Sequence, residues 1–279
     1  MTYRPRAESA RILEVAWQHV ESVPYRVSLR WLFYRLLQEG IYRGKDDYTY
    51  TFKGLLTRAR KEFYNGWGPD TLADETRAAV KRGFGYVDDL GWLQSLCSHG
   101  CILDKWESQP CYVELWFEAR AMTEQFTYYT DYITLRPFGG DPSLDFKWQA
   151  AKHLEAVAKA YPGKRLVVLY FGDLDDKGLQ IPKSAAGDIQ SWCEVPFELV
   201  RCGINPGQEK QFNIPQQFDK PGAYQWESLT DQDAQHLIKS SVSQFVDLPA
   251  MTEVETQEHD IDRRFRADMQ SVIANWAAT

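Results

Sequence analysis

The residues best suited to chemistry lie between Gly172 and Gly178, in the segment G-D-L-D-D-K-G that follows an unbroken apolar run. Asp173 and Asp175 are spaced i, i+2, so their side chains point the same way in extended backbone. Two such carboxylates repel each other, and a hard divalent cation with oxygen ligands relieves that repulsion. The flanking glycines allow a tight turn and the close approach of a phosphate. Acidic turns after strands are also common without any metal, so the motif alone supports both interpretations.

A further carboxylate, Glu118, directly follows the segment Cys111–Phe117, which reads as a strand. The run 166–171 before Asp173 reads as a strand buried on both faces. Because ligands bind at the carboxyl ends of strands in open parallel sheets, we expect Glu118, Asp173 and Asp175 to meet at one sheet edge. There they would form a magnesium site for phosphoryl transfer. Glu114 sits in mid-strand and is expected to be a partly buried or edge-facing carboxylate.

The elements that position these residues alternate between strand and helix from residue 111 onward. Such alternation predicts an α/β class with a parallel sheet covered by helices. The chain is turn-rich after Pro206 and ends in two helices, the first capped by Thr230 with Asp233 three residues on. The further strands are expected over 132–135 and 196–201, and the helices over 119–126, 146–161, 181–193 and 254–276.

The N-terminal part reads as three helices, over 8–21, from Ser28 to about residue 39, and over 51–64. One face of the third helix carries Lys53, Arg60 and Lys61. Short helices with one basic stripe suggest a helix-turn-helix or winged-helix module that binds DNA, and the alternative is a solvated helical face. The opposite, apolar face is expected to be buried and consists of Phe52, Leu55, Leu56, Ala59 and Phe63.

Charge divides along the chain. The net charge is -7, yet basic residues outnumber acidic ones over residues 1–82 and acidic residues dominate the rest. This asymmetry fits a basic nucleic-acid-binding module joined to an acidic one, or two solvated surfaces of different charge. We expect a cytoplasmic protein, because the sequence has neither an apolar leader nor a run long enough to span a membrane.

Three parts follow: a winged-helix-like DNA-binding domain over 1–82, a glycine-interrupted connecting region over 83–110, and an α/β domain with a C-terminal helical extension over 111–279. The five cysteines are an odd number spread over a long chain, which favours reduced thiols. Cys97, His99, Cys101 and Cys111 match none of the usual zinc spacings, so free thiols are expected there.

The two acidic segments carry a family resemblance. W-F-E-A-R-A-M at 116–122, followed by V-L-Y-F-G-D-L-D-D-K-G at 168–178, resembles the Toprim domain of topoisomerases and related nucleases. The resemblance implies that Glu118, Asp173 and Asp175 hold Mg²⁺. G-G-D-P-S-L at 139–144 and W-E-S-L at 226–229 also resemble the subgroup of the topoisomerase VI A subunit and the meiotic double-strand-break transesterase. Glu227 matches an acidic position of that subgroup.

That subgroup carries a nucleophilic tyrosine in a winged-helix motif written roughly R-D-I-(Y/F)-Y. Arg30 and Tyr34 match it, and Trp31 stands where the family has Asp. Tyr34 lies off the apolar stripe of its helix, with Arg30 four residues earlier on the same face. A phenol with a pKa near 10 needs a nearby cation to act as a nucleophile, which Arg30 and metal ions would supply. The alternative is a tyrosine packed against a neighbouring element.

Together these features predict magnesium-dependent cleavage of double-stranded DNA by transesterification, with Tyr34 as the nucleophile. The resemblance also implies a homodimer, in which the tyrosine of one subunit meets the acidic site of the other, and an ATPase partner subunit. Two other functions stay open. One is a Toprim nuclease that uses activated water, and the other is a phage or plasmid DNA-binding protein whose acidic site is structural.

Overall fold

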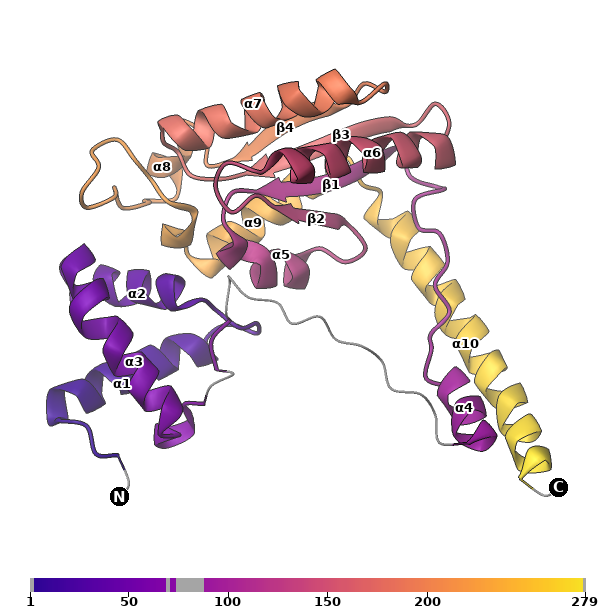
Figure 1. The fold of residues 1–279 in the computed structure, drawn as a ribbon, viewed down its shortest axis with the longest axis horizontal. Helices are drawn as coiled ribbons and strands as arrows, with labels where there is room; N and C mark the ends of the chain where they lie inside the picture. The colour runs from indigo at the N-terminus through magenta and orange to yellow at the C-terminus, as the bar shows by residue number, and fades with distance from the viewer. Residues whose placement is uncertain (1–2, 69–70, 74–87, 278–279) are drawn as a thin grey trace.

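The computed structural model describes residues 3–68, 71–73 and 88–277, and this part of the chain contains ten α-helices and a four-stranded sheet. A group of helices from the N-terminal residues lies beside an α/β body, and a helical arm leaves that body at the C-terminus (Figure 1). The predicted α/β class is confirmed. The predicted boundary between residues 82 and 83 lies outside the described residues.

The N-terminal helices enclose a core of their own. Ser28 begins the second helix as a cap, because its hydroxyl accepts a hydrogen bond from the backbone N–H of Trp31 at 3.1 Å. Within residues 3–68 and 71–73 the backbone forms helices and one isolated β-bridge, between Ser28 and Ala73. The helices are α1 (Ala7–Glu21), α2 (Leu29–Gln38), η1 (Asp47–Phe52), α3 (Lys53–Lys61) and η2 (Tyr64–Gly66). Their fully buried core includes Leu13, Leu32, Leu36, Phe52 and Leu56.

The sheet is entirely parallel and has the strand order β2-β1-β3-β4. Its two central strands are buried along almost their whole length, as expected for a sheet covered on both faces. The chain moves outward from β1 in one direction to β2 and in the other to β3 and β4. The strands are β1 (Cys111–Phe117), β2 (Thr134–Pro137), β3 (Arg165–Phe171) and β4 (Glu198–Gly203).

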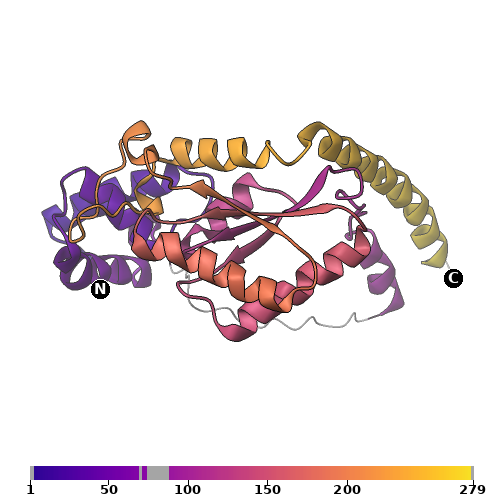
Figure 2. The same cartoon turned by 90° about the horizontal axis from the view of Figure 1, so that it is seen from above.

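Helices cover both faces of the sheet and give the body three layers. α6 (Leu144–Ala160) and α7 (Asp176–Trp192) pack together on one face, while α5 (Thr123–Tyr129) and α9 (Asp231–Val242) pack on the other (Figures 1 and 2). The predicted cap of α9 is confirmed, since the Thr230 hydroxyl accepts from the N–H of Asp233 at 3.1 Å. Together these layers form the larger of the two hydrophobic cores.

The remaining elements connect or extend this body. The short helices are η3 (Arg120–Met122), α8 (Gln208–Gln211) and η4 (Trp226–Ser228). The C-terminal helix α10 (Leu248–Trp276) projects from the body and carries α4 (Asp89–Leu96) against its far half (Figure 2). Within the described residues, no helix combines the length and the apolar character needed to cross a bilayer.

Several predicted boundaries are wrong for identifiable reasons. Phe63 was expected in the core but is 70% exposed, because α3 ends at Lys61 and Phe63 takes a left-handed backbone conformation. The region predicted only to connect contains α4, whose cap Asp88 accepts from the N–H of Gly91 at 2.6 Å. α7 begins at Asp176, five residues before the expected start, because Asp175 caps it.

Candidate functional site

The site lies where the sheet changes direction, at the carboxyl ends of β1 and β3. In a sheet of order β2-β1-β3-β4, the connections after these neighbouring strands run to opposite sides and leave a crevice between them. Glu118 follows β1 there, and its carboxylate accepts a hydrogen bond from the backbone N–H of Asp173 at 2.9 Å. Glu118 and Asp173 therefore lie together at one edge, but the expected set of three metal ligands with Asp175 is not formed among the described residues, where Asp175 pairs with Lys220 instead.

Asp173 lies among other negative groups. Its carboxylate accepts from the backbone N–H of Trp226 at 2.8 Å, which joins it to the loop before α9. Removal from water raises its pKa well above the ordinary range, and the charges of Glu227 and Glu118 raise it further. The pKa of Glu118 is also raised, first by burial and then by Asp175 and Glu227. Glu227, the further acid suggested by the family resemblance, is 5% exposed.

Asp175 has a different environment from Asp173. One carboxylate oxygen accepts from the N–H of Gly178 at 2.7 Å and begins α7. The other forms an ion pair with Lys220 at 2.7 Å. Burial alone would raise the pKa of Asp175, but these hydrogen bonds outweigh it and lower the pKa. Of the two acids of the motif, Asp175 is thus held by hydrogen-bond donors of the protein, whereas Asp173 faces other negative charges.

The glycines of the motif make room for this packing. A Cβ at Gly178 would lie 2.2 Å from the backbone oxygen of Asp173, which no side chain can do. A Cβ at Gly172 would lie 2.8 Å from both Glu118 Oε2 and the Tyr170 hydroxyl. Glycine is therefore required at Gly178, where the obstacle is backbone, whereas a side chain at Gly172 would force Glu118 and Tyr170 to move.

Tyr170 and Arg201 belong to the site and carried no signal in the sequence. The Tyr170 hydroxyl is fully buried beside Glu118 and is one of four buried polar side-chain atoms without a partner among the described residues. Burial, followed by the charge of Glu118, raises the pKa of Tyr170. The Arg201 guanidinium donates to the carbonyl oxygens of Asp173 at 2.6 Å and Gly178 at 2.7 Å, so it shapes the acidic loop.

Tyr34 and Arg30 reach this site from α2 of the same chain. The Tyr34 hydroxyl donates a hydrogen bond to the side-chain oxygen of Gln225. Burial raises the pKa of Tyr34, Arg30 lowers it by charge and by hydrogen bonding, and Glu227 raises it, with a net increase. Burial by itself would lower the pKa of the Arg30 guanidinium. Its interactions with Glu227 and Tyr34 outweigh burial, so its pKa is raised. The tyrosine that was expected to serve a partner's site lies beside the acids of its own chain.

Arg35 fastens α2 to the loop that contains Glu227. Its guanidinium donates to the carbonyl oxygens of Glu227 at 2.7 Å and Leu229 at 2.6 Å, and Gln38 donates to that of Ser228 at 2.9 Å. Arg35 is 8% exposed, and burial lowers its pKa to about 10. A buried arginine next to Tyr34 was not expected, because only the apolar stripe was assigned to the core.

The predicted DNA-binding stripe lies on the outer face of α3. Lys53 and Lys61 are exposed, and Arg60 is half-buried. The Arg60 side chain donates to the carbonyl oxygen of Gly68 at 3.2 Å, which ties it to the local fold. The stripe therefore contains two freely exposed ammonium groups and one arginine that also has a structural contact.

The cysteines follow no metal-binding pattern. All five are free, and Cys111 donates to the carbonyl oxygen of Phe245 at 3.0 Å from within the core. Cys97 and Cys101 are half-buried near the arm. Across residues 3–68, 71–73 and 88–277, no three His, Cys, Asp or Glu side chains form a ready set of metal ligands.

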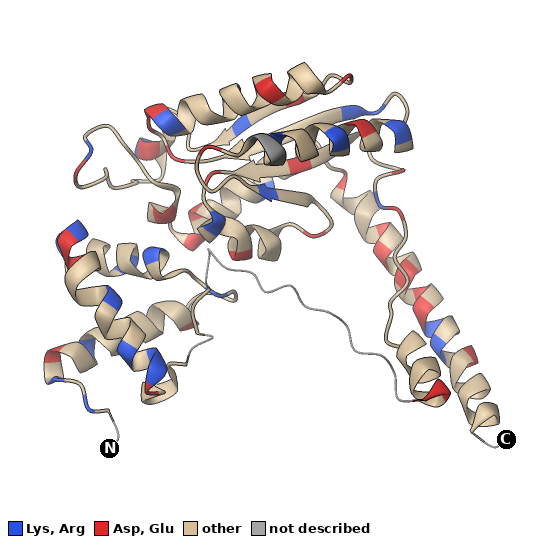
Figure 3. Ribbon diagram, in the orientation of Figure 1, with Lys and Arg blue, Asp and Glu red and all other residues tan. Residues whose placement is uncertain are grey.

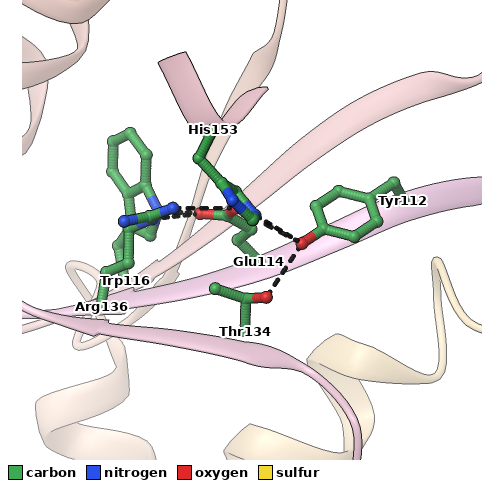
Figure 4. Close-up of polar contacts among 6 residues, drawn as sticks. All are labelled: Tyr112, Glu114, Trp116, Thr134, Arg136 and His153. Carbon is green, nitrogen blue, oxygen red and sulfur yellow. Dashed lines mark hydrogen bonds and ion pairs between the residues drawn. The ribbon is translucent and has the colours of Figure 1, made fainter. Parts of the chain in front are cut away.

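Glu114 is the centre of a separate polar network (Figure 4). It was expected to be partly buried or at an edge, but it is fully buried because β1 is central and covered on both faces. Its carboxylate pairs with Arg136 at 2.7 Å and His153 at 3.1 Å and accepts from Trp116 at 2.9 Å. Burial opposes its ionisation, but these partners lower its pKa. Glu114 thus has structural partners and does not face the crevice.

Glu118 and Asp173 supply oxygen donors of the kind a divalent cation prefers, although no third His, Cys, Asp or Glu completes a ligand set with them among the described residues. Glu118 and Asp173 are oxygen donors whose pKa values are raised by burial and neighbouring negative charge, which a cation would offset. Comparison of the chain with protein families, with curated proteins and with solved structures yields no match.

Proposed function

We propose that the protein cleaves DNA strands by transesterification, with Tyr34 as the nucleophile and Mg²⁺ as the cofactor. The observation that supports this most is the meeting of two elements distant in sequence. Tyr34 and Arg30 on α2 interact electrostatically with Asp173 and Glu227 at the crevice between β1 and β3. A phenol, a guanidinium and several carboxylates gathered at a switch point are the groups that phosphoryl transfer requires.

The proposed fold assignment is a Toprim domain with a winged-helix-like domain before it. It is supported by an all-parallel sheet in which Glu118 follows β1 and Asp173 and Asp175 follow β3. The homodimer, the ATPase partner and the double-stranded DNA substrate belong to the same proposal. The described N-terminal helices present a basic outer face, which suits a duplex backbone.

In the proposed reaction, the Tyr34 oxygen attacks a backbone phosphorus and forms a phosphotyrosine ester. The bond between that phosphorus and one deoxyribose oxygen breaks, and the sugar leaves as a hydroxyl after taking a proton from water. Gln225 orients the phenol by accepting its hydrogen bond. The phenolic proton passes to a water molecule, because Asp173 and Glu118 are the carboxylates that would hold the cation. Arg30 stabilises the phenolate and the phosphate charge.

The cation would be held by Glu118 and Asp173, with Asp175 and Glu227 as the further carboxylates. When bound, it would supply charge stabilisation to the phosphate oxygens. Glu118 is steadied by the N–H of Asp173, and the loop that presents both groups is shaped by Arg201. These contacts would hold the donors in place without contributing ligands of their own.

One observation favours a second candidate, a nuclease that uses activated water. The pKa of Tyr34 is raised, mainly by burial, which makes its ionisation harder in the absence of substrate. Water activated at the same carboxylates would require no tyrosine. The two candidates share a cation and a substrate but differ in whether protein becomes joined to DNA.

The deciding experiment compares wild type with Tyr34→Phe, Asp173→Asn and Tyr50→Phe on end-labelled duplex DNA. Tyr34→Phe keeps the ring and should lower cleavage by roughly a thousandfold or more while DNA binding stays intact. Asp173→Asn should also lose cleavage. Tyr50 is 81% exposed on η1, so Tyr50→Phe is the matched control and should behave as wild type.

The reactions are read on denaturing gels with and without Mg²⁺, before and after protease treatment. Transesterification leaves DNA ends whose mobility changes on proteolysis, in wild type and Tyr50→Phe only. Cleavage by Tyr34→Phe at the wild-type rate, with no protein-linked DNA, would reject the tyrosine mechanism in favour of activated water.

A further inference from the structure

One segment of the chain runs along the acidic site. We call residues 217–227 the strap; they end the loop after α8, which projects at one end of the sheet and carries both signs of charge (Figures 1 and 3). Leu174, between the two aspartates, donates its N–H to the carbonyl oxygen of Tyr224 at 2.8 Å and accepts from the N–H of Tyr224 at 3.1 Å. The N–H of Trp226 donates to the Asp173 carboxylate at 2.8 Å. The strap is therefore bonded to the acidic loop itself.

The turn that carries Lys220 is closed by its own hydrogen bonds. The N–H of Gln217 donates to the carbonyl oxygen of Ala223 at 2.7 Å, and the N–H of Ala223 donates to that of Lys220 at 3.1 Å. Gly222 has a left-handed backbone conformation in this turn, with a φ of +82°, which glycine adopts without a steric penalty. The backbone of Lys220 is thus held in place, whereas its long side chain has rotatable bonds that allow the ammonium to move.

The Lys220 ammonium contacts Asp175 from the solvent side. Its Nζ is 2.7 Å from Asp175 Oδ2, while Asp175 Oδ1 accepts from the N–H of Gly178 at 2.7 Å. The Lys220 side chain is 43% exposed, and that of Asp175 is 15% exposed. An ion pair with one partner this exposed is weak, because water competes for the ammonium. Lys220 can therefore leave Asp175 without breaking the hydrogen bond that begins α7.

The other acids of the crevice lack a comparable partner. Among residues 3–68, 71–73 and 88–277, Asp175 alone of the four crevice carboxylates forms an ion pair with a lysine, arginine or histidine. The remaining three are Glu118, Asp173 and Glu227. Arg30 acts on two of them at longer range. The fully buried Tyr170 hydroxyl beside Glu118 also has no hydrogen-bond partner in the part of the chain that the structure describes. The crevice therefore holds more negative charge than its own cations pair with.

We propose that Lys220 is a built-in competitor of the divalent cation, because its ammonium occupies the Asp175 carboxylate that Mg²⁺ would use. This role rests on the Mg²⁺ of the proposed function and adds the residue that controls its binding. Both positive groups are attracted by one carboxylate and repel each other, so one replaces the other. In the closed state Lys220 pairs with Asp175, and in the open state the ammonium is in water and the carboxylate is available.

This competition explains why the described residues contain no ready set of three metal ligands. Lys220 occupies the carboxylate that the D-x-D motif would contribute as the third ligand beside Glu118 and Asp173. Because only the open state would accept the cation, Lys220 lowers the apparent affinity of the chain for Mg²⁺.

Calorimetric titration of the full chain with Mg²⁺, in the absence of DNA, tests the competition. Lys220→Met removes the ammonium and keeps most of the apolar stem, so the dissociation constant for Mg²⁺ should fall by about threefold to tenfold. Lys177→Met is the matched control, because Lys177 is exposed in the same acidic motif and its loss changes the net charge equally. Its dissociation constant should stay within about twofold of wild type, since solvent and salt screen an exposed charge.

A second substitution locates the competition on Asp175. Asp175→Asn removes the charge but keeps an oxygen that can begin α7. In that background Lys220→Met should bring no further gain in affinity, because the carboxylate for which the two cations compete is absent. Circular dichroism checks that each variant is folded.

Acylation of lysine amines measures the release of Lys220 directly. Addition of Mg²⁺ to wild type should make Lys220 react faster, because its ammonium has left the ion pair, and should leave Lys177 unchanged. Mass spectrometry of the digested chain gives both rates.

Equal Mg²⁺ affinities of wild type and Lys220→Met would overturn the role of Lys220 and leave the cation of the proposed function in place. Weaker binding by Lys220→Met would overturn it too, since Lys220 would then support the site. A gain that persists in the Asp175→Asn background would reject competition at that carboxylate. Absence of Mg²⁺ binding in every variant, Lys220→Met included, would overturn both the competition and the cation of the proposed function.

Discussion

At the residue scale, Asp173 and Asp175 illustrate how position within one motif decides chemistry. Both follow β3, yet Asp175 is neutralised by Lys220 and the start of α7, whereas Asp173 faces Glu227 and Glu118. Environments that push two pKa values apart assign different roles to like residues. In this site Asp175 is the fixed anchor of the loop, and Asp173 is the carboxylate whose protonation state responds to its surroundings.

Asp173 should therefore contribute to how stability depends on pH. Its pKa is raised on folding above 3.8, so between the two values the folded chain binds more protons than the unfolded chain does. The free energy of unfolding contributed by this group therefore falls as the pH rises through that interval. Asp173→Asn removes the titration, so it should stabilise the chain at neutral pH, and the gain should shrink as the pH approaches 4.

Urea unfolding at several pH values, with and without Mg²⁺, measures this effect. Mg²⁺ should stabilise wild type and have less effect on Asp173→Asn, because the cation relieves the same repulsion. Asp176→Asn is the control, since Asp176 is exposed in the same motif. A pH profile that is the same for wild type and Asp173→Asn would contradict the raised pKa.

At the scale of elements, the strands and caps could be predicted because their signals are local. The apolar segment Cys111–Phe117 is a strand with the predicted bounds, and the caps Ser28 and Thr230 begin helices as expected. The meeting of Glu118 and Asp173 followed from a general rule of parallel sheets. The start of α7 was missed because Gly178 and Pro182 are poor helix formers and hid the cap at Asp175.

The residues that sequence reasoning missed depend on contacts between distant elements. Arg201 donates hydrogen bonds to backbone carbonyl groups of another loop. The buried position of the Tyr170 hydroxyl depends on the direction in which its strand runs. Arg35 acts through carbonyls some 190 positions away. Every residue has a backbone carbonyl group, so the sequence does not show which of them accepts a side-chain hydrogen bond. The roles of these groups could therefore not be predicted from residue spacing.

The docking of α2 on the loop before α9 should depend on Arg35. Arg35→Met keeps most of the apolar stem but leaves the carbonyl groups of Glu227 and Leu229 without their donor. Loss of buried hydrogen bonds of this kind costs about 1–3 kcal/mol. We expect that decrease in the free energy of unfolding, together with faster amide exchange in the loop 225–229.

Arg26→Met is the matched control, because Arg26 also joins the N-terminal part to the body. Its ion pair with Glu124 is 2.9 Å long, but both side chains are exposed, so its loss should cost roughly 0–1 kcal/mol. Chemical denaturation of both variants gives the comparison. Equal losses would show that burial of Arg35 does not set the strength of this contact.

At the scale of the whole molecule, the N-terminal helices and the α/β body differ in charge and have separate hydrophobic cores. The N-terminal helices have their own core and a basic outer face, while the body has a larger core and the acidic crevice. α2 belongs to the first and carries Tyr34 to the second. The net charge of -7 therefore conceals a basic outer face on the N-terminal helices.

DNA affinity should accordingly depend on salt through the exposed lysines of α3. Lys53→Ala with Lys61→Ala removes two exposed ammonium groups and spares Arg60, which is bonded to Gly68. Each lost phosphate contact lowers the slope of log affinity against log salt by about one, so a decrease of roughly two is expected. The loss should be similar for unrelated duplex sequences, because phosphates carry no base identity. Lys183→Ala with Lys210→Ala, two exposed lysines of the body, is the control. Fluorescence anisotropy at several salt concentrations gives both slopes, and a slope unchanged from wild type would mean that DNA does not lie on α3.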